Sequence, residues 1–147
     1  YDYICVSKNI DMKKIILPVL KAVFAFLFFY PYQRYASFTN IIFLEDVDED
    51  GNPVETGTSF IINQDGGYIY FYCNLGHEVN CTQIHYTIYS LDDYGTKHYE
   101  NIIYQDVETS WAYFWKKISF YHTGDYNVYV YDDKYNLLAQ GTVRIKM

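Results

Sequence analysis

The fold class is decided by the stretch Gly124-Asp-Tyr-Asn-Val-Tyr-Val-Tyr-Asp-Asp-Lys-Tyr-Asn-Leu-Leu-Ala-Gln-Gly-Thr-Val-Arg-Ile-Lys146. In its first half, Tyr126, Val128 and Val130 alternate with more polar positions, and this period of two predicts a strand whose apolar row faces inward. Residues 132–136 are a cluster of turn formers, and the alternation resumes after them. The stretch therefore predicts a hairpin, which we expect at the C-terminal edge of an antiparallel β-sandwich.

Further strands precede this hairpin at the spacing that is typical of an all-β sandwich. They are predicted at residues 39–47, 59–63, 68–73, 81–91, 97–107 and 110–121, which gives seven or eight strands in all. The strand at 97–107 is the more polar one and is expected at a sheet edge. No helix pattern and no internal repeat follows residue 37, so a single all-β domain is the simplest interpretation.

The segment Thr123-Gly-Asp-Tyr-Asn-Val-Tyr-Val130 resembles the start of the penultimate strand in immunoglobulin-like and fibronectin-III-like domains. The resemblance implies that Tyr126 is a tyrosine corner, whose hydroxyl bonds to the backbone upstream. Val128 stands where antibody domains carry their second cysteine, so the inter-sheet disulfide of that family is absent. The resemblance spans residues 38–147 and implies an interaction module of the kind found in bacterial exported proteins.

Residues 12–37 have the pattern of a secretory signal peptide. Two lysines follow Met12, an apolar run occupies residues 22–30, and a polar end follows. Residues 1–11 are then expected to lie upstream of the start or at the edge of a fragment. A signal peptide predicts a domain outside the cytoplasm: in the periplasm, on the cell surface or secreted. An uncleaved membrane anchor, which would be the one contact with a membrane, and a helix of the folded domain stay open as alternatives.

The charge of the predicted domain excludes one class of partner. The chain has 18 acidic and 11 basic residues and a net charge of -7. Five of the basic residues and two of the acidic ones precede Ser37, which leaves six basic and sixteen acidic residues in the remainder. Such an acidic domain repels phosphate backbones, so we expect no binding to nucleic acid.

Tyrosine is the most informative residue type for function, with 19 copies in the chain. If the apolar rows point inward, the tyrosines between them point outward, where they can anchor a protein partner or stack on a sugar ring. The predicted binding face consists of Tyr68, Tyr70, Tyr72, Tyr129, Tyr131, Trp111 and Trp115. The alternative is that tyrosine serves only as a strand former.

Two cysteines flank the loop at residues 74–80. In an exported protein, Cys73 and Cys81 are in a compartment where a disulfide can form. The sequence leaves three alternatives open, namely a bridge, two buried free thiols, and a metal pair with His77. Cys5 precedes the inferred start and is expected to take no part.

Asp46, Asp48 and Asp50 have the opening spacing of a calcium loop. Counted from Asp46, however, the twelfth position is Gly57 and not the bidentate Glu of an EF-hand. The alternative is a solvated turn between two strands. Calcium is thus the one cofactor that the sequence suggests.

Catalytic patterns are absent from the sequence. The four histidines, His77, His85, His98 and His122, have no metal-ligand spacing, and we expect them on the surface or in loops. The chain has no nucleophile elbow, HExxH motif or Gly-rich phosphate loop. The predicted function is a non-catalytic binding or structural module that acts through a tyrosine-rich sheet face or its end loops. The alternatives are a carbohydrate-binding module that uses aromatic stacking and a small secreted enzyme.

Overall fold

The computed structural model describes residues 38–147, which form ten β-strands. They are β1 (Thr39–Asn40), β2 (Ile42–Val47), β3 (Pro53–Gly57), β4 (Ser59–Ile61), β5 (Gly67–Asn74), β6 (Gln83–Leu91), β7 (Lys97–Asp106), β8 (Tyr113–Phe120), β9 (Gly124–Asp132) and β10 (Leu137–Lys146). The predicted all-β class is confirmed, and the predicted signal segment at residues 12–37 lies outside the described residues. No helix of the described part is long and apolar enough to cross a membrane.

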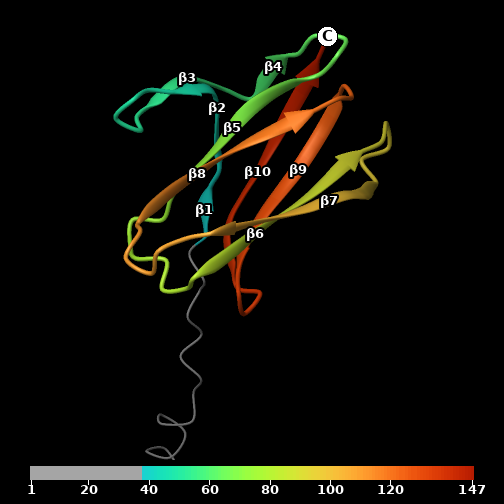
Figure 1. Ribbon diagram of the computed structural model, residues 1–147. Helices are drawn as coiled ribbons and strands as arrows, with labels where there is room; N and C mark the ends of the chain where they lie inside the picture. Colours follow the sequence, from blue (N-terminus) through green and yellow to red (C-terminus); the bar gives the residue numbers. More distant parts are fainter. Residues whose placement is uncertain (1–37) are drawn as a thin grey trace, which may run out of the picture. The chain divides into compact units, whose positions relative to one another are not determined.

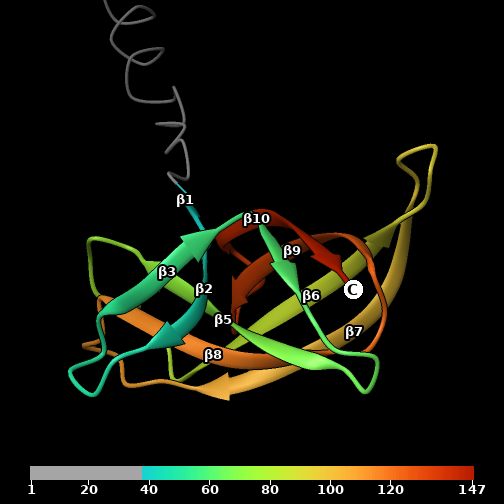
Figure 2. The ribbon, with the colours of Figure 1, turned by 90° about the horizontal axis from the view of Figure 1, so that it is seen from above.

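The strands form two sheets packed face to face. The six-stranded sheet has the order β1-β10-β9-β6-β7, with β4 also paired to β10, and the four-stranded sheet has the order β3-β2-β5-β8 (Figure 1). Seen from above, β2 and β3 of the four-stranded sheet lie on the left and β7 of the six-stranded sheet lies on the right (Figure 2). Strands β10, β9, β6 and β7 in one sheet and β2, β5 and β8 in the other give the strand order of an immunoglobulin-like β-sandwich.

The closing hairpin forms with the predicted inward row but at a different place in the sheet. Val128 and Val130 of β9 have no exposed surface, and Val143 and Ile145 of β10 are buried beside them. The prediction of an edge position was wrong. Strand β10 lies between β9 and the short strands β1 and β4, which pair with it in parallel. Because β9 pairs with both β10 and β6, the hairpin lies in the interior of its sheet.

The predicted strand at residues 39–47 is two strands that belong to different sheets. Strand β1 pairs with β10, whereas β2 pairs with β5. Between them the Ile41 amide donates to the carbonyl oxygen of Gln140 at 2.8 Å. Strand β3 was not predicted, because it is a polar edge strand exposed over most of its length. The aromatic strand begins at Tyr113 and not at residue 110, so Trp111 belongs to the preceding loop.

The core between the sheets is built around the fully buried Phe71 ring of β5. Its ring centroid lies 5.1 Å from that of Phe43, 6.0 Å from Tyr86 and 6.1 Å from Phe120. A Cβ at Gly141 of the facing sheet would lie 2.8 Å from the Phe43 ring, so glycine there permits the close approach of the two layers. Burial of each such ring stabilises the fold by about 2–3 kcal/mol.

Tyr126 anchors the start of β9. Its buried hydroxyl donates to the carbonyl oxygen of His122 at 3.0 Å, which is the hydrogen bond that the resemblance to immunoglobulin-like domains implies. The Tyr126 ring also packs edge-on against Phe120, with the centroids 4.9 Å apart. These contacts fix the chain where it enters the central strand of the six-stranded sheet.

Candidate functional site

The structure does not bring the seven residues of the predicted binding face together. Those on the outer surface of the four-stranded sheet are Tyr68, Tyr70, Tyr72 and Trp115. Tyr129 and Tyr131 lie on the outer surface of the six-stranded sheet, and Trp111 lies in the loop before β8. Because the outer surfaces of a sandwich point away from each other, one partner cannot rest on both at once.

The outer surface of the six-stranded sheet carries the larger aromatic group, here called the tyrosine surface. It consists of Tyr89, Tyr99, Tyr104, Tyr129, Tyr131, Tyr135 and His85. Strand register explains the grouping, because Tyr131 of β9, His85 of β6 and Tyr104 of β7 are direct neighbours across three strands. Tyr89 and Tyr99 face each other in the same way between β6 and β7.

The rings at one end of the tyrosine surface touch in sequence. Ring centroids are 6.1 Å apart between Tyr99 and Tyr89, 6.0 Å between Tyr89 and Tyr129, and 6.4 Å between Tyr129 and Tyr131. The Lys97 ammonium donates to the Tyr129 hydroxyl and lies 4.8 Å from the centroid of its ring. These contacts pack the phenol rings against one another.

His85 lies at the other end and contacts Tyr131 and two further tyrosines. Its ring centroid is 5.4 Å from Tyr131, 5.7 Å from Tyr104 and 5.2 Å from Tyr135. Only 6% of the residue is exposed, so the expectation of a surface or loop histidine was wrong here. Burial lowers its pKa, and the nearby Asp132 carboxylate opposes that shift in part. The His85 ring is therefore uncharged at neutral pH, and it packs as an aromatic ring among three tyrosines.

Tyr135 reaches this surface from a strained turn. One carboxylate oxygen of Asp132 accepts the amides of residues 134 and 136, at 2.9 and 2.8 Å. The Asp48 and Asp92 turns have the same pair of bonds, with glycine at the fourth position and φ values of 83° and 79°. Tyr135 occupies that position with φ 63°, a conformation that costs an L-residue about 1–2 kcal/mol.

Sequence reasoning missed most members of the tyrosine surface. Tyr89 had the outward phase on its predicted strand, and the alternation around it was a usable signal. Tyr99 and Tyr104 lie on a polar edge strand with no clean alternation, and Tyr135 lies in a turn. Their approach to His85 and Tyr89 depends on strand pairing across the sheet, which one sequence does not encode locally.

The aromatic row on the outer surface of the four-stranded sheet has contacts with other parts of the chain, although Tyr68, Tyr113 and Trp115 remain 50%, 50% and 38% exposed. The Lys117 ammonium lies 3.3 Å from the centroid of the Tyr68 ring and 5.7 Å from that of Tyr70. The β2–β3 turn lies against Trp115, since a Cβ at Gly51 would be 3.2 Å from its ring. Internal groups therefore contact part of this aromatic row.

The three carboxylates of the predicted calcium loop are not assembled for a cation. Asp48 accepts the amides of Asp50 and Asn52 at 3.0 and 2.7 Å, and the Asn52 side chain at 3.0 Å. These bonds, the Asn52 side chain first, lower the pKa of Asp48. Asp46 accepts the amide of Val47. Over residues 38–147, no group of three His, Cys, Asp or Glu residues is placed to hold a metal ion. The segment has the hydrogen bonds of the alternative, a turn between strands.

Cys73 and Cys81 are both free, buried thiols. The structure therefore has no disulfide between Cys73 and Cys81. It agrees with the alternative of two buried free thiols. Burial raises the pKa of both thiols, so both are protonated at neutral pH. His77 was suggested as a metal ligand together with these cysteines. Its Nδ1 instead lies 2.9 Å from the carbonyl oxygen of Glu78.

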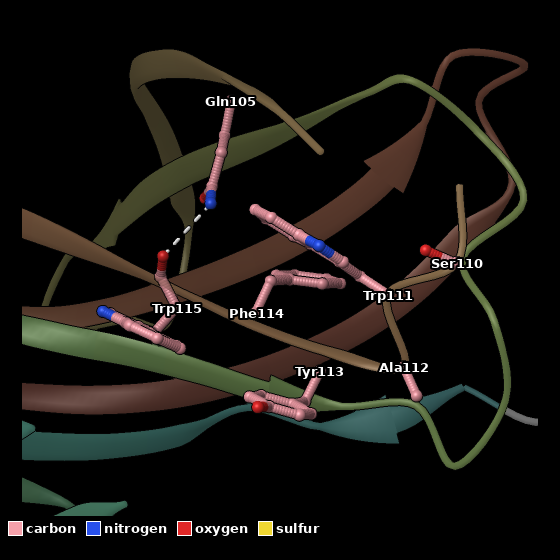
Figure 3. A pocket seen from close by; sticks show the side chains of 7 residues that line it. All are labelled: Gln105, Ser110, Trp111, Ala112, Tyr113, Phe114 and Trp115. Carbon is pink, nitrogen blue, oxygen red and sulfur yellow. Dashed lines mark hydrogen bonds between the residues drawn. The ribbon is translucent and has the colours of Figure 1, made fainter. Parts of the chain in front are cut away.

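A separate pocket lies beside the start of β8. Its volume is about 530 Å³. The residues that line it are Gln105, Ser110, Trp111, Ala112, Tyr113, Phe114 and Trp115 (Figure 3). The pocket is distinct from the tyrosine surface, because the two share no residue.

Comparison with known families finds no family model that matches the chain, and comparison with curated proteins finds no relative. Among solved structures, the chain is similar to the crystal structure of an immunoglobulin-like protein from Pseudomonas aeruginosa. The two chains are 11% identical with a TM-score of 0.46, and the match covers 74% of this chain and 90% of the other. Likeness at this level carries no information about function. The fold assignment follows from the strand order of this domain, which is an immunoglobulin-like β-sandwich.

Proposed function

We propose that this domain is a non-catalytic binding module that docks a protein partner on the tyrosine surface. The observation that supports this most directly is the unbroken series of ring contacts from Tyr99 to Tyr135 through His85. The outer face of an antiparallel sheet normally presents polar residues to water. A contiguous aromatic patch at that position is a mark of an interaction site.

The chemistry of the surface suits a protein partner. Tyrosine is enriched among the residues that dominate binding energy, because its ring buries a large area while its hydroxyl remains able to hydrogen-bond. The rings here support each other, so little conformational entropy is lost when a partner binds. Tyr99 and Tyr104 remain 60% and 53% exposed and are available as the first contacts.

We propose further that the module acts outside the cytoplasm, at the cell surface, in the periplasm or in the medium. The support for this comes from the sequence of residues 12–37, with its basic start and apolar run. The acidic balance of the remaining chain is in keeping with a soluble exported domain.

Site-specific photo-cross-linking on the full chain tests the docking site. A photoreactive phenylalanine analogue replaces Tyr99 in one variant and Tyr121 in another. Tyr121 is the matched control, because it is 64% exposed and lies outside the tyrosine surface. With the surface proteins of the source cells, we expect one protein to be cross-linked from position 99 and not from position 121. The substitution Tyr131→Ala should abolish that product.

Three results would contradict the proposal. Equal cross-linking from both positions would indicate non-specific contact. A product that persists in the Tyr131→Ala variant would place the partner elsewhere. Labelling of glycans without any protein product would favour the carbohydrate-binding alternative at this surface.

A further inference from the structure

The pocket beside β8 wraps around the edge of the four-stranded sheet, because β8 is the last strand of that sheet. The Trp111 indole lies over the buried Phe114 ring on the inner side of the strand (Figure 3). The Tyr113 and Trp115 rings lie on the other side, nearly parallel at 10° with centroids 6.3 Å apart. The site therefore offers flat aromatic surfaces on both sides of one strand.

Gln105 supplies a fixed polar group in the lining of this pocket. Its Oε1 accepts the hydroxyl of the buried Tyr86 at 2.7 Å, and its Nε2 donates to the carbonyl oxygen of Trp115 at 3.1 Å. A glutamine amide has two N–H donors and two acceptor lone pairs. One donor and one acceptor are thus left over after these two bonds. The amide is held in one orientation and can serve a pair of ligand hydroxyls.

The charge of the lining restricts the ligand further. None of the seven lining residues is charged, although acidic residues outnumber basic ones by sixteen to six from Ser37 onward. Burying an ionised group in an uncharged aromatic site is costly. The ligand should therefore be neutral, with apolar faces for the rings and hydroxyl groups for Gln105 and Ser110.

We propose that this pocket binds a neutral oligosaccharide. One sugar ring lies against the Trp111 indole and places two hydroxyls on the Gln105 amide, and the next ring lies against the Tyr113–Trp115 pair. A volume of about 530 Å³ is within the usual range for small-ligand sites, roughly 300–1,000 Å³. This site is independent of the tyrosine surface, so the domain can engage a glycan and a protein at once.

Titration with defined tetrasaccharides tests this inference. The full 147-residue chain is titrated with cellotetraose, xylotetraose, mannotetraose and chitotetraose, and with tetragalacturonate as the charged control. Binding is followed by tryptophan fluorescence and calorimetry. We expect at least one neutral tetrasaccharide to bind with a Kd below about 1 mM, and tetragalacturonate to bind at least tenfold more weakly.

Two variants locate the binding. Trp111→Ala removes a stacking surface, and Gln105→Met keeps the size of the side chain while it removes the amide. We expect each to weaken binding of the same tetrasaccharide about tenfold or more, whereas Tyr99→Ala on the tyrosine surface leaves it unchanged. Far-UV circular dichroism and thermal unfolding verify that each variant is folded. If Trp111→Ala fails to fold, the Gln105→Met variant still shows whether the tetrasaccharide binds at this pocket.

The inference is overturned if no neutral tetrasaccharide binds at about 10 mM, or if the charged control binds more tightly than all of them. It is also overturned if binding persists in a folded Gln105→Met variant. Neither result bears on the tyrosine surface, whose own test uses a protein cross-link.

Discussion

Both outer surfaces of this sandwich carry rows of aromatic rings, but the contacts of these rings with the rest of the chain differ. On the four-stranded sheet, Lys117 lies on the Tyr68 ring and the β2–β3 turn lies against Trp115. On the six-stranded sheet the rings contact each other and surround the buried His85. Lys97 lies over the Tyr129 ring, and Tyr99 and Tyr104 remain more than half exposed.

The difference shows that a row of outward tyrosines is not by itself a binding face. Lys117 and the turn at residues 48–52 contact the aromatic row of the four-stranded sheet, and these contacts contribute to stability. The tyrosine surface has the longer series of ring contacts, and these rings surround the buried His85. The two surfaces should therefore respond differently to substitution, in stability on one side and in binding on the other.

Leu44→Ala should give the largest effect on stability. Leu44 is on the outer side of β2, opposite Tyr70, yet it has no exposed surface, so the chain itself covers it. Truncation leaves a cavity, and we expect the free energy of unfolding to fall by about 3 kcal/mol in urea denaturation. Ile42→Ala, two residues earlier on the same face and 39% exposed, should cost less than about 1 kcal/mol. Equal losses of stability in the two variants would contradict the burial of Leu44.

Tyr131→Ala and Tyr72→Ala should separate the two surfaces by binding. Both tyrosines are half-buried on central strands, but only Tyr131 contacts His85 and Tyr129. We expect Tyr131→Ala to weaken binding of the protein cross-linked at position 99 by about 2 kcal/mol, as for an interface hot spot. Tyr72→Ala should change it by less than about twofold, because it lies on the opposite side of the domain. A comparable loss in both variants would show that the effect comes from the fold.

Exchanges in two turns should test why Tyr135 is held in a left-handed conformation. Gly95→Ala in the Asp92 turn should cost about 1 kcal/mol, because nothing lies within 4 Å of the new Cβ and only the backbone is strained. Tyr135→Gly relieves the same strain but loses the contact with His85, so its effect on thermal unfolding should stay within about 0.5 kcal/mol. It should nevertheless weaken partner binding. Unchanged binding would remove Tyr135 from the tyrosine surface.

Local pattern was sufficient for the parts of the fold whose contacts are close in sequence. The alternation around Val128 and Val130 identified the central hairpin, and the Gly-Asp-Tyr segment led to Tyr126. The break between strands at Ile41 could not be predicted from local sequence, because it depends on the pairing of β1 with a strand about 100 residues later.

The site was less accessible than the fold for the same reason. Outward tyrosines were identified, but the sequence does not say which sheet they belong to or what covers them. Lys117, the Gly51 turn and the burial of His85 decide this, and each acts through a contact between different strands or turns. Trp111 and Gln105 come together because the loop from the end of β7 to the start of β8 lines one pocket.

The smallest expected effect is a pH dependence that belongs to the tyrosine surface alone. Burial lowers the pKa of His85 from its usual 6.5, so the folded state takes up its proton at lower pH than the unfolded state does. Stability is then complete above pH 6.5 and is lost as the pH falls from 6.5 toward the pKa of the folded state. Asp92, whose pKa is lowered to about 2 chiefly by its hydrogen bond with His98, titrates below this window.

His85→Phe isolates this contribution, because it keeps an aromatic ring between the tyrosines and removes the titration. Both proteins are unfolded in urea between pH 8 and pH 5. The difference between their free energies of unfolding should be constant above about pH 6.5. Below it, the wild type should lose stability relative to the variant, while the other three histidines cancel in the comparison. A difference that stays constant over the whole range would mean that His85 is as well solvated as a histidine in the unfolded chain. The rings around it would then not form the closed aromatic layer on which the proposed docking surface depends.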